Sequence, residues 1–163
     1  MADDSVEPQQ RENGSAAADR PMLAIGAQYI KDLSFENPLG PEGLAKLTEN
    51  PKVEVEVNTS ARLLAESAYE VSLFIRAEAQ SGDATAFIVE LTYGGIVIVG
   101  DVAEEDIQPL VLIEGPRHLF PFARSVVANV TRDGGFPPMM IDPIDFAALY
   151  MENDAARAGF DIS

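Results

Sequence analysis

The sequence predicts an α+β protein with a four-stranded antiparallel sheet, followed by two C-terminal helices packed on one face. Two observations on segment order lead to this prediction. Segments in which apolar and polar residues alternate come first along the chain, and segments with helical spacing come last. Strands followed by helices are typical of antiparallel α+β folds rather than of βαβ folds. A third observation is the length, since 163 residues suit one domain with a substantial core.

The two ends of the chain differ in composition from its middle. Residues 1–20 are polar and show no apolar period, so we expect a disordered N-terminal tail. Residues 21–152 are expected to form the folded domain. Residues 153–163 carry Gly159 and scattered charges, and we predict a flexible C-terminal tail in which Phe160 is the large apolar residue to be tied down.

Four segments have the pattern of strands, over residues 22–35, from Lys52 onward, over about 68–80 and over about 84–99. The connection over 36–51 is rich in Pro and Gly and is long for a hairpin, which suggests a function. The fourth segment is apolar on both faces. One face can pack against helices, and a partner subunit would cover the other face. Its Gly94-Gly95 pair predicts a bulge or bend.

Helical spacing begins at Pro116, after a short helix or turn over 109–114. Gly134-Gly135 ends this first helix, and Pro137-Pro138 predicts an extended segment over 136–141. Asp142-Pro143 is predicted to open the second helix, because Asp is a good N-cap and Pro suits the first turn. The apolar stripe of the first helix comprises Leu119, Phe122, Ala123, Val126, Val127 and Val130.

The charge and composition exclude several classes of function. The formal net charge is -16, although 47% of the residues are hydrophobic. An acidic surface repels nucleic acid and anionic lipid and attracts basic partners. The chain has no Cys, which excludes disulfides and thiolate ligands. No segment approaches the roughly 20 apolar residues that cross a bilayer, and we see no signal peptide, so we expect a cytoplasmic protein without membrane insertion.

No constellation for catalysis or metal binding stands out. His118 is the only His, and we interpret it as a surface residue because triads and zinc sites need partners. The acidic run at residues 104–106 is interpreted as a solvated helix start, although paired carboxylates in a cleft stay possible. Gly94-Gly95 matches no phosphate-binding motif. The sequence therefore favours a binding or scaffolding protein, without a cofactor, over an enzyme.

Several segments resemble signatures of the SecB family of bacterial protein-export chaperones. They occur in the order of the family with matching gaps, and together they cover about residues 22–151. The resemblance is carried by Tyr29–Pro38 in the first strand, by Glu90 with Gly94-Gly95 in the fourth, by Leu119–Arg124 at the start of the long helix, and by Gly135–Met139 with Pro143–Tyr150 near the end.

The resemblance implies a function and an assembly. SecB proteins are ATP-independent chaperones that bind unfolded secretory precursors in the cytosol, keep them competent for translocation and deliver them to the export motor SecA. Their subunits form homotetramers, built as dimers of dimers. The family uses no catalytic residue, metal or cofactor, so the resemblance implies none for this chain.

The resemblance also assigns residues to three surfaces. The SecA-binding residues would be Asp32, Glu36, Ile88 and Glu90. The client-peptide groove would include Leu44, Leu47, Phe136, Met139, Ile141, Phe146 and Leu149. The oligomer interface would include Val89, Leu91 and Tyr93, for which ordinary core packing is the alternative. Many relatives carry a Trp in the loop after the first strand, whereas this chain has none.

Two other functions stay open from the sequence. One is a SecB-like chaperone that serves a toxin–antitoxin system, which a lack of affinity for SecA would favour. The other is a small α+β enzyme or ligand-binding domain. Activity on a small substrate that disappears when one carboxylate is removed would favour that second alternative.

Overall fold

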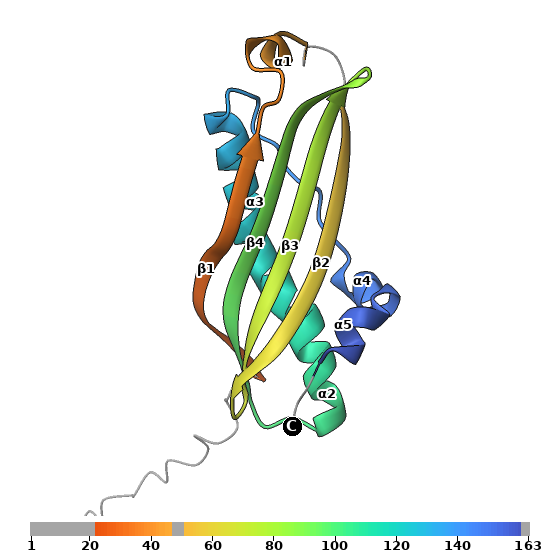
Figure 1. Ribbon diagram of the computed structural model, residues 1–163. Helices are drawn as coiled ribbons and strands as arrows, with labels where there is room; N and C mark the ends of the chain where they lie inside the picture. The colour runs from red at the N-terminus through yellow and green to blue at the C-terminus, as the bar shows by residue number, and fades with distance from the viewer. Residues whose placement is uncertain (1–21, 47–50, 161–163) are drawn as a thin grey trace, which may run out of the picture.

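The computed structural model describes residues 22–46 and 51–160. It confirms the predicted four-stranded antiparallel sheet with the helices on one face (Figure 1). The predicted N-terminal tail and Leu47 lie outside the described residues. The strands are β1 (Leu23–Glu36), β2 (Lys52–Ala65), β3 (Ala68–Ser81) and β4 (Ala84–Val99).

The order of the strands in the sheet is β1-β4-β3-β2. Strands β2, β3 and β4 follow each other as neighbours, whereas β1 pairs with the last strand. The chain must therefore cross one end of the sheet between β1 and β2, which lie at opposite edges. This crossing explains the length of the connection over 37–51, which contains the short helix α1 (Pro41–Lys46).

Alternate side chains divide the sheet into an inner face, which the helices cover, and an outer face. Inner-face residues of β3 and β4 form the centre of the core. This division follows from the two-residue repeat of a β-strand, because neighbouring residues point to opposite faces of the sheet. The fully buried apolar side chains on the inner face include Val71, Leu73, Ile75, Val89, Leu91 and Val97.

A long helical segment crosses the inner face behind the sheet (Figure 1). It consists of α2 (Glu104–Pro109), the π-helical turn η1 (Leu110–Glu114) and α3 (Gly115–Asp133). The predicted helix start at the acidic residues is correct, and α3 begins within one residue of the predicted start at Pro116, although the helix extends back through η1 to Glu104. The wider π turn lies just before Pro116, whose ring would otherwise clash with the carbonyl of Leu112.

The C-terminal part forms α4 (Phe146–Glu152) and α5 (Asp154–Ala158). The predicted helix start at Asp142 is wrong, because the N-cap is Asp145, whose carboxylate accepts a hydrogen bond from the Ala148 backbone N–H at 3.1 Å. Both aspartates suit a cap, so residue type alone does not choose between them. Within the predicted C-terminal tail over 153–163, the described residues include α5 and Phe160, which packs against the core.

The predicted bulge at Gly94-Gly95 is wrong, because β4 keeps its register with β3 through both residues. The extra residues lie in β1 instead, between Ile25 and Gln28 and at Lys31. Each glycine makes room on one face of the sheet. An added Cβ would lie 2.6 Å from the Tyr29 ring at Gly94 and 2.5 Å from Leu119 Cδ2 at Gly95.

Candidate functional site

The four residues assigned to SecA binding share the outer face of the sheet. Glu36 pairs with Ile88 across the β1–β4 ladder, and Ser34 and Asp32 pair with Glu90 and Thr92. Directly paired residues stand on the same face. The structure therefore brings these four residues together, on the face opposite to the helices.

Carboxylates from the other two strands extend this group into an acidic patch. The β2–β3 and β3–β4 ladders place Glu54 opposite Glu78, Glu56 opposite Arg76, and Arg76 opposite Glu90. We define the acidic patch by its six carboxylates, which are those of Asp32, Glu36, Glu54, Glu56, Glu78 and Glu90.

Two cations pair with the acidic patch in the described part of the chain. Arg76 contacts Glu78 at 2.9 Å and Glu90 at 3.2 Å, and Lys52 contacts Glu54 at 3.2 Å. Glu78 also accepts hydrogen bonds from Gln80 and Thr85. The hydrogen bond from Gln80, followed by those from Arg76 and Thr85, lowers the pKa of the Glu78 carboxyl. Six carboxylates against two cations leave an excess of negative charge.

A second charged group lies towards the other end of the outer face. We call it the Glu70 cluster, and it consists of Tyr29, Lys31, Arg62 and Glu70. The Glu70 carboxylate accepts hydrogen bonds from the Tyr29 hydroxyl, from Lys31 Nζ at 2.9 Å and from Arg62 Nε at 2.9 Å. These donors come from β1 and β2, at the two edges of the sheet. Glu70 is only 7% exposed.

Gly94 explains how β1 reaches Glu70. Strand β4 lies between β1 and β3, and the ring of Tyr29 and the stem of Lys31 lie over Gly94. A side chain at this position would fill the space that they cross. The three hydrogen bonds, the one from Tyr29 foremost, lower the pKa of the Glu70 carboxyl to about 2. Glu70 thus stays ionised and fully partnered, which leaves it unsuited to a further ligand.

The residues assigned to the client groove divide by burial. Phe136, Ile141 and Phe146 are core residues, and the ring of Phe136 lies 5.0 Å from that of Phe87 between centroids. Leu44 is exposed on α1, where it lies close to Gly135. Met139 and Leu149 are half-buried at the edge of the core. The structure therefore places only part of the predicted set at the surface.

A hollow of about 270 Å³ opens on the inner face near the start of β2. Val53 and Val55 of β2 are 40% and 43% exposed there, although they point to the helix side. The hollow and these valines form what we call the apolar groove. Its lining residues are Pro51, Val53, Ala79, Phe87, Pro137, Pro138 and Met139.

Sequence reasoning found Met139 but missed the two valines. Their alternation with Glu54 and Glu56 predicts only that they share one face of a half-buried strand. The helices leave this end of β2 open, and no local pattern in the sequence gives that information.

Val89, Leu91 and Tyr93, assigned to the oligomer interface, belong to the core. They point to the helices, and Val89 and Leu91 have no exposed area. The core alternative is therefore the one that the structure supports for all three. Exposed apolar side chains occur instead at the free edge of β1 and on α3, where Ile30 is 48% and Phe122 52% exposed.

The other polar candidates, His118 and the acidic run at residues 104–106, are exposed on the long helical segment. His118 Nδ1 lies 2.7 Å from the Glu114 carbonyl oxygen on the surface of the long helix. Over residues 22–46 and 51–160, no group of three acidic or His residues could hold a metal ion. No helix in the same ranges is long and apolar enough to cross a membrane.

An acidic face and an apolar groove lie on opposite sides of one sheet. Surfaces of this kind are typical of proteins that bind other polypeptides.

Comparisons with known proteins identify the family. The family model described as preprotein translocase subunit SecB matches residues 16–157. The protein-export protein SecB of a Bradyrhizobium species is 50% identical over 149 residues, which cover 90% of this chain and 92% of that protein. The corresponding protein of Parvibaculum lavamentivorans is 44% identical over 164 residues, covering 97% and 98%. The chain therefore belongs to the SecB family and acts as a chaperone of protein export.

A solved structure supports the fold. The SecB-like chaperone of Mycobacterium tuberculosis, in complex with an antitoxin peptide, has a TM-score of 0.64 at 15% identity. The match covers 76% of this chain and 91% of that one. This likeness confirms the arrangement of sheet and helices.

Proposed function

We propose that this chain holds unfolded precursor proteins in the apolar groove and passes them to SecA through the acidic patch. The observation that carries the proposal is that the two surfaces lie on opposite faces of one sheet. Each surface can then be occupied while the other stays accessible, so that a loaded chaperone can still dock on the motor in the cytosol.

Client binding would follow from the chemistry of the groove. Unfolded chains expose the apolar side chains that a folded protein buries. Exposed valines, prolines and Met139 offer an apolar surface without a fixed hydrogen-bond pattern, and Met adapts to different partners. Several weak contacts along one client chain multiply through effective concentration. Binding of the unfolded state delays folding by mass action, without nucleotide.

Docking on SecA would follow from charge. The acidic patch has more carboxylates than cations, so it attracts a basic partner and speeds its association. Asp32, Glu36 and Glu90 stand on the same face as Ile88, which adds an apolar contact at the centre of the patch.

We also propose that the chain forms a homotetramer, but through residues other than Val89, Leu91 and Tyr93. The free edge of β1 offers unpaired backbone groups beside exposed apolar side chains, which favours pairing with a second chain. Ile30, Leu33 and Phe122 are the residues that we assign to this contact. Sedimentation should give about four times the mass of one chain, and a stable monomer would contradict the assignment.

A second candidate function is chaperoning of an antitoxin. The M. tuberculosis neighbour binds an antitoxin peptide, and an apolar groove suits such a peptide as well as a precursor. Affinity for SecA separates the two candidates, because only the export function needs it.

The test of the proposed function is the refolding of a denatured exported precursor without nucleotide. The wild-type protein should slow refolding at stoichiometric concentration, and Val53→Asp should slow it much less because a charge in the groove opposes apolar binding. Ser60→Asp, which adds the same charge at an exposed residue on the outer face of β2, is the control. Refolding at the unassisted rate with the wild-type protein would contradict the proposal.

A further inference from the structure

Phe160 follows α5 and packs back onto the sheet. Its ring stacks on that of Tyr69, with the centroids 5.3 Å apart and the planes inclined by 17°. Tyr69 belongs to the inner face of β3 and is almost fully buried, whereas Phe160 is only half-buried. The contact therefore joins a fixed ring of the sheet to a ring near the end of the chain.

Apart from hydrogen bonds and an ion pair within residues 151–160, few polar contacts hold the segment that carries Phe160. Gln108 Nε2 donates a hydrogen bond to the Arg157 carbonyl oxygen at 2.8 Å, and the Arg157 guanidinium lies 5.4 Å from the centre of the Tyr150 ring. Helix α5 has five residues, and so short a helix is not stable by itself. Segments with few buried contacts open locally without global unfolding. The Phe160 segment can thus leave Tyr69 while the sheet stays folded.

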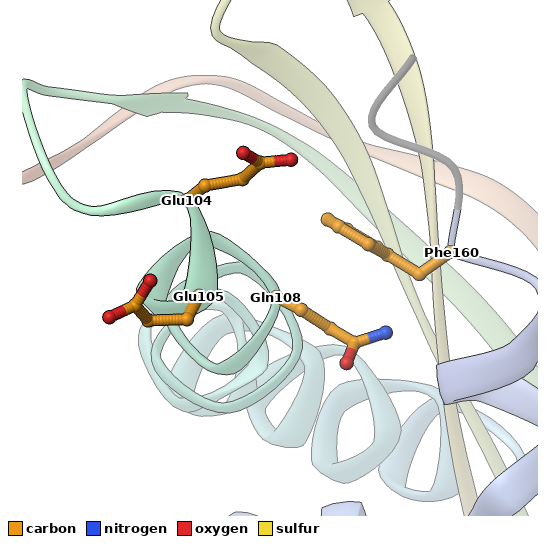
Figure 2. A pocket seen from close by; sticks show the side chains of 4 residues that line it. All are labelled: Glu104, Glu105, Gln108 and Phe160. Atoms are coloured by element: carbon orange, nitrogen blue, oxygen red, sulfur yellow. The ribbon is translucent and has the colours of Figure 1, made fainter.

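Open space lies on both sides of the contact. Figure 2 shows Phe160 at one wall of a hollow of about 430 Å³, opposite Glu104 and beside Gln108. Tyr69 lines another hollow of about 370 Å³. The further lining residues of that second hollow are Leu63, Glu66, Ser67, Val99, Gly100 and Ile107. Another polypeptide can therefore reach this surface once Phe160 moves.

We propose that Phe160 is an internal competitor for the client: it fills, in the free protein, a subsite on Tyr69 that accepts an aromatic side chain of an unfolded chain. The inference rests on the proposed client groove and adds a subsite and its regulation. A terminal segment that offers one aromatic ring is chemically the same ligand as a short piece of unfolded client. Glu66, Glu104 and Glu105 at the rim favour clients with a basic residue beside the ring.

The spacing along β3 fixes how one client reaches both sites. Ala79 lines the apolar groove and Tyr69 forms the subsite, both on the inner face. Ten residues of strand separate them, which corresponds to about 34 Å at 3.4 Å per residue. An extended client segment of about ten residues spans the same distance. Two aromatic residues at this spacing would therefore occupy both sites and displace Phe160.

The first test uses Phe160→Trp, because the chain has no other Trp. The probe is a basic peptide of about 20 residues with two Phe about ten positions apart, the spacing of the two sites. At saturation it should shift the Trp emission to longer wavelength and increase quenching by iodide. The same peptide with one Phe replaced by Ser should bind, as measured by anisotropy of a label, without this change. An unchanged Trp emission with the two-Phe peptide at saturation would overturn the inference.

The second test is Phe160→Ala, with Met151→Ala as a control at an exposed residue of α4. The Kd of the two-Phe peptide should fall by about two- to tenfold in Phe160→Ala, the range expected for one ring stack. The Met151→Ala variant should equal the wild type. Equal or weaker binding by Phe160→Ala would reject the competitor. If neither wild type nor variant binds either peptide, the client groove itself is wrong and the inference falls with it.

Discussion

The outer face has two groups of charged residues, the Glu70 cluster and the acidic patch, and their carboxylates lie in opposite environments. In the Glu70 cluster, one buried carboxylate has three donors, two of which are cations. In the acidic patch, six carboxylates share two cations and stand mostly in solvent. The first group satisfies its charge within the chain, whereas the second has an excess of negative charge.

The difference follows from what lies on the neighbouring strand. Gly94 lets Tyr29 and Lys31 cross β4 and reach Glu70, so the two edge strands become linked over the outer face. At the other end, Ile88 and Glu90 occupy the corresponding positions of β4 and fill the space. A carboxylate on this sheet is therefore buried and paired with several donors where glycine makes room for them, and it is more exposed where glycine is absent.

The largest expected difference between the Glu70 cluster and the acidic patch is the loss of stability when one glutamate is replaced. Glu70→Gln should lower the free energy of unfolding by about 2 kcal/mol, because Lys31 and Arg62 lose a charged acceptor. Glu90→Gln, the matched change in the acidic patch, should stay within about 0.5 kcal/mol. Urea denaturation at pH 7 measures both. Equal losses in the two variants would remove the distinction.

The pH dependence sharpens the same comparison. The pKa of the folded Glu70 carboxyl is about 2, below its ordinary value of 4.5. A lowered pKa means that its contribution is complete above about pH 4.5 and is lost as the pH falls towards 2. The wild type should therefore lose more stability between pH 5 and pH 2 than Glu70→Gln does. Parallel pH profiles of the denaturation midpoint would count against the low pKa.

The smallest expected effect on stability concerns Tyr29, the uncharged donor to Glu70. Tyr29→Phe keeps the ring over Gly94 and removes only its hydrogen bond to Glu70. We expect a loss of about 1 kcal/mol in the free energy of unfolding, and a higher pKa for the Glu70 carboxyl. Titration of Glu70 by NMR in the variant checks the second part; a pKa that stays near 2 would show that Lys31 and Arg62 suffice.

Local patterns predicted the strands well, because alternation in β2 and β3 is a property of neighbouring residues. Local patterns did not predict the environment of a residue where that environment depends on contacts distant in the sequence. The donors of Glu70 on β1 lie 39 and 41 residues away, and alternation shows Glu70 as an ordinary outward residue. Alternation also shows that Val89 and Leu91 share a face, but not whether helices or a subunit cover it.

The full length of the long helix was missed for a different reason. The sequence predicted only a short helix or turn over 109–114 before Pro116, yet the chain is helical from Glu104 to Asp133 with one π turn. Packing of this segment on the inner face outweighs the local cost of the prolines. The assignment of residues on the outer face to SecA binding came from the family resemblance, since no spacing in one strand reveals that β1 pairs with β4.

The central claim, that client and motor use opposite faces of one sheet, is tested by binding both partners to two variants. Glu90→Lys on the outer face should weaken SecA binding by about tenfold and leave the affinity for an unfolded precursor unchanged. Val53→Asp on the inner face should do the reverse. If either variant loses both affinities to the same extent while remaining folded, the two surfaces are not separate and the account is wrong.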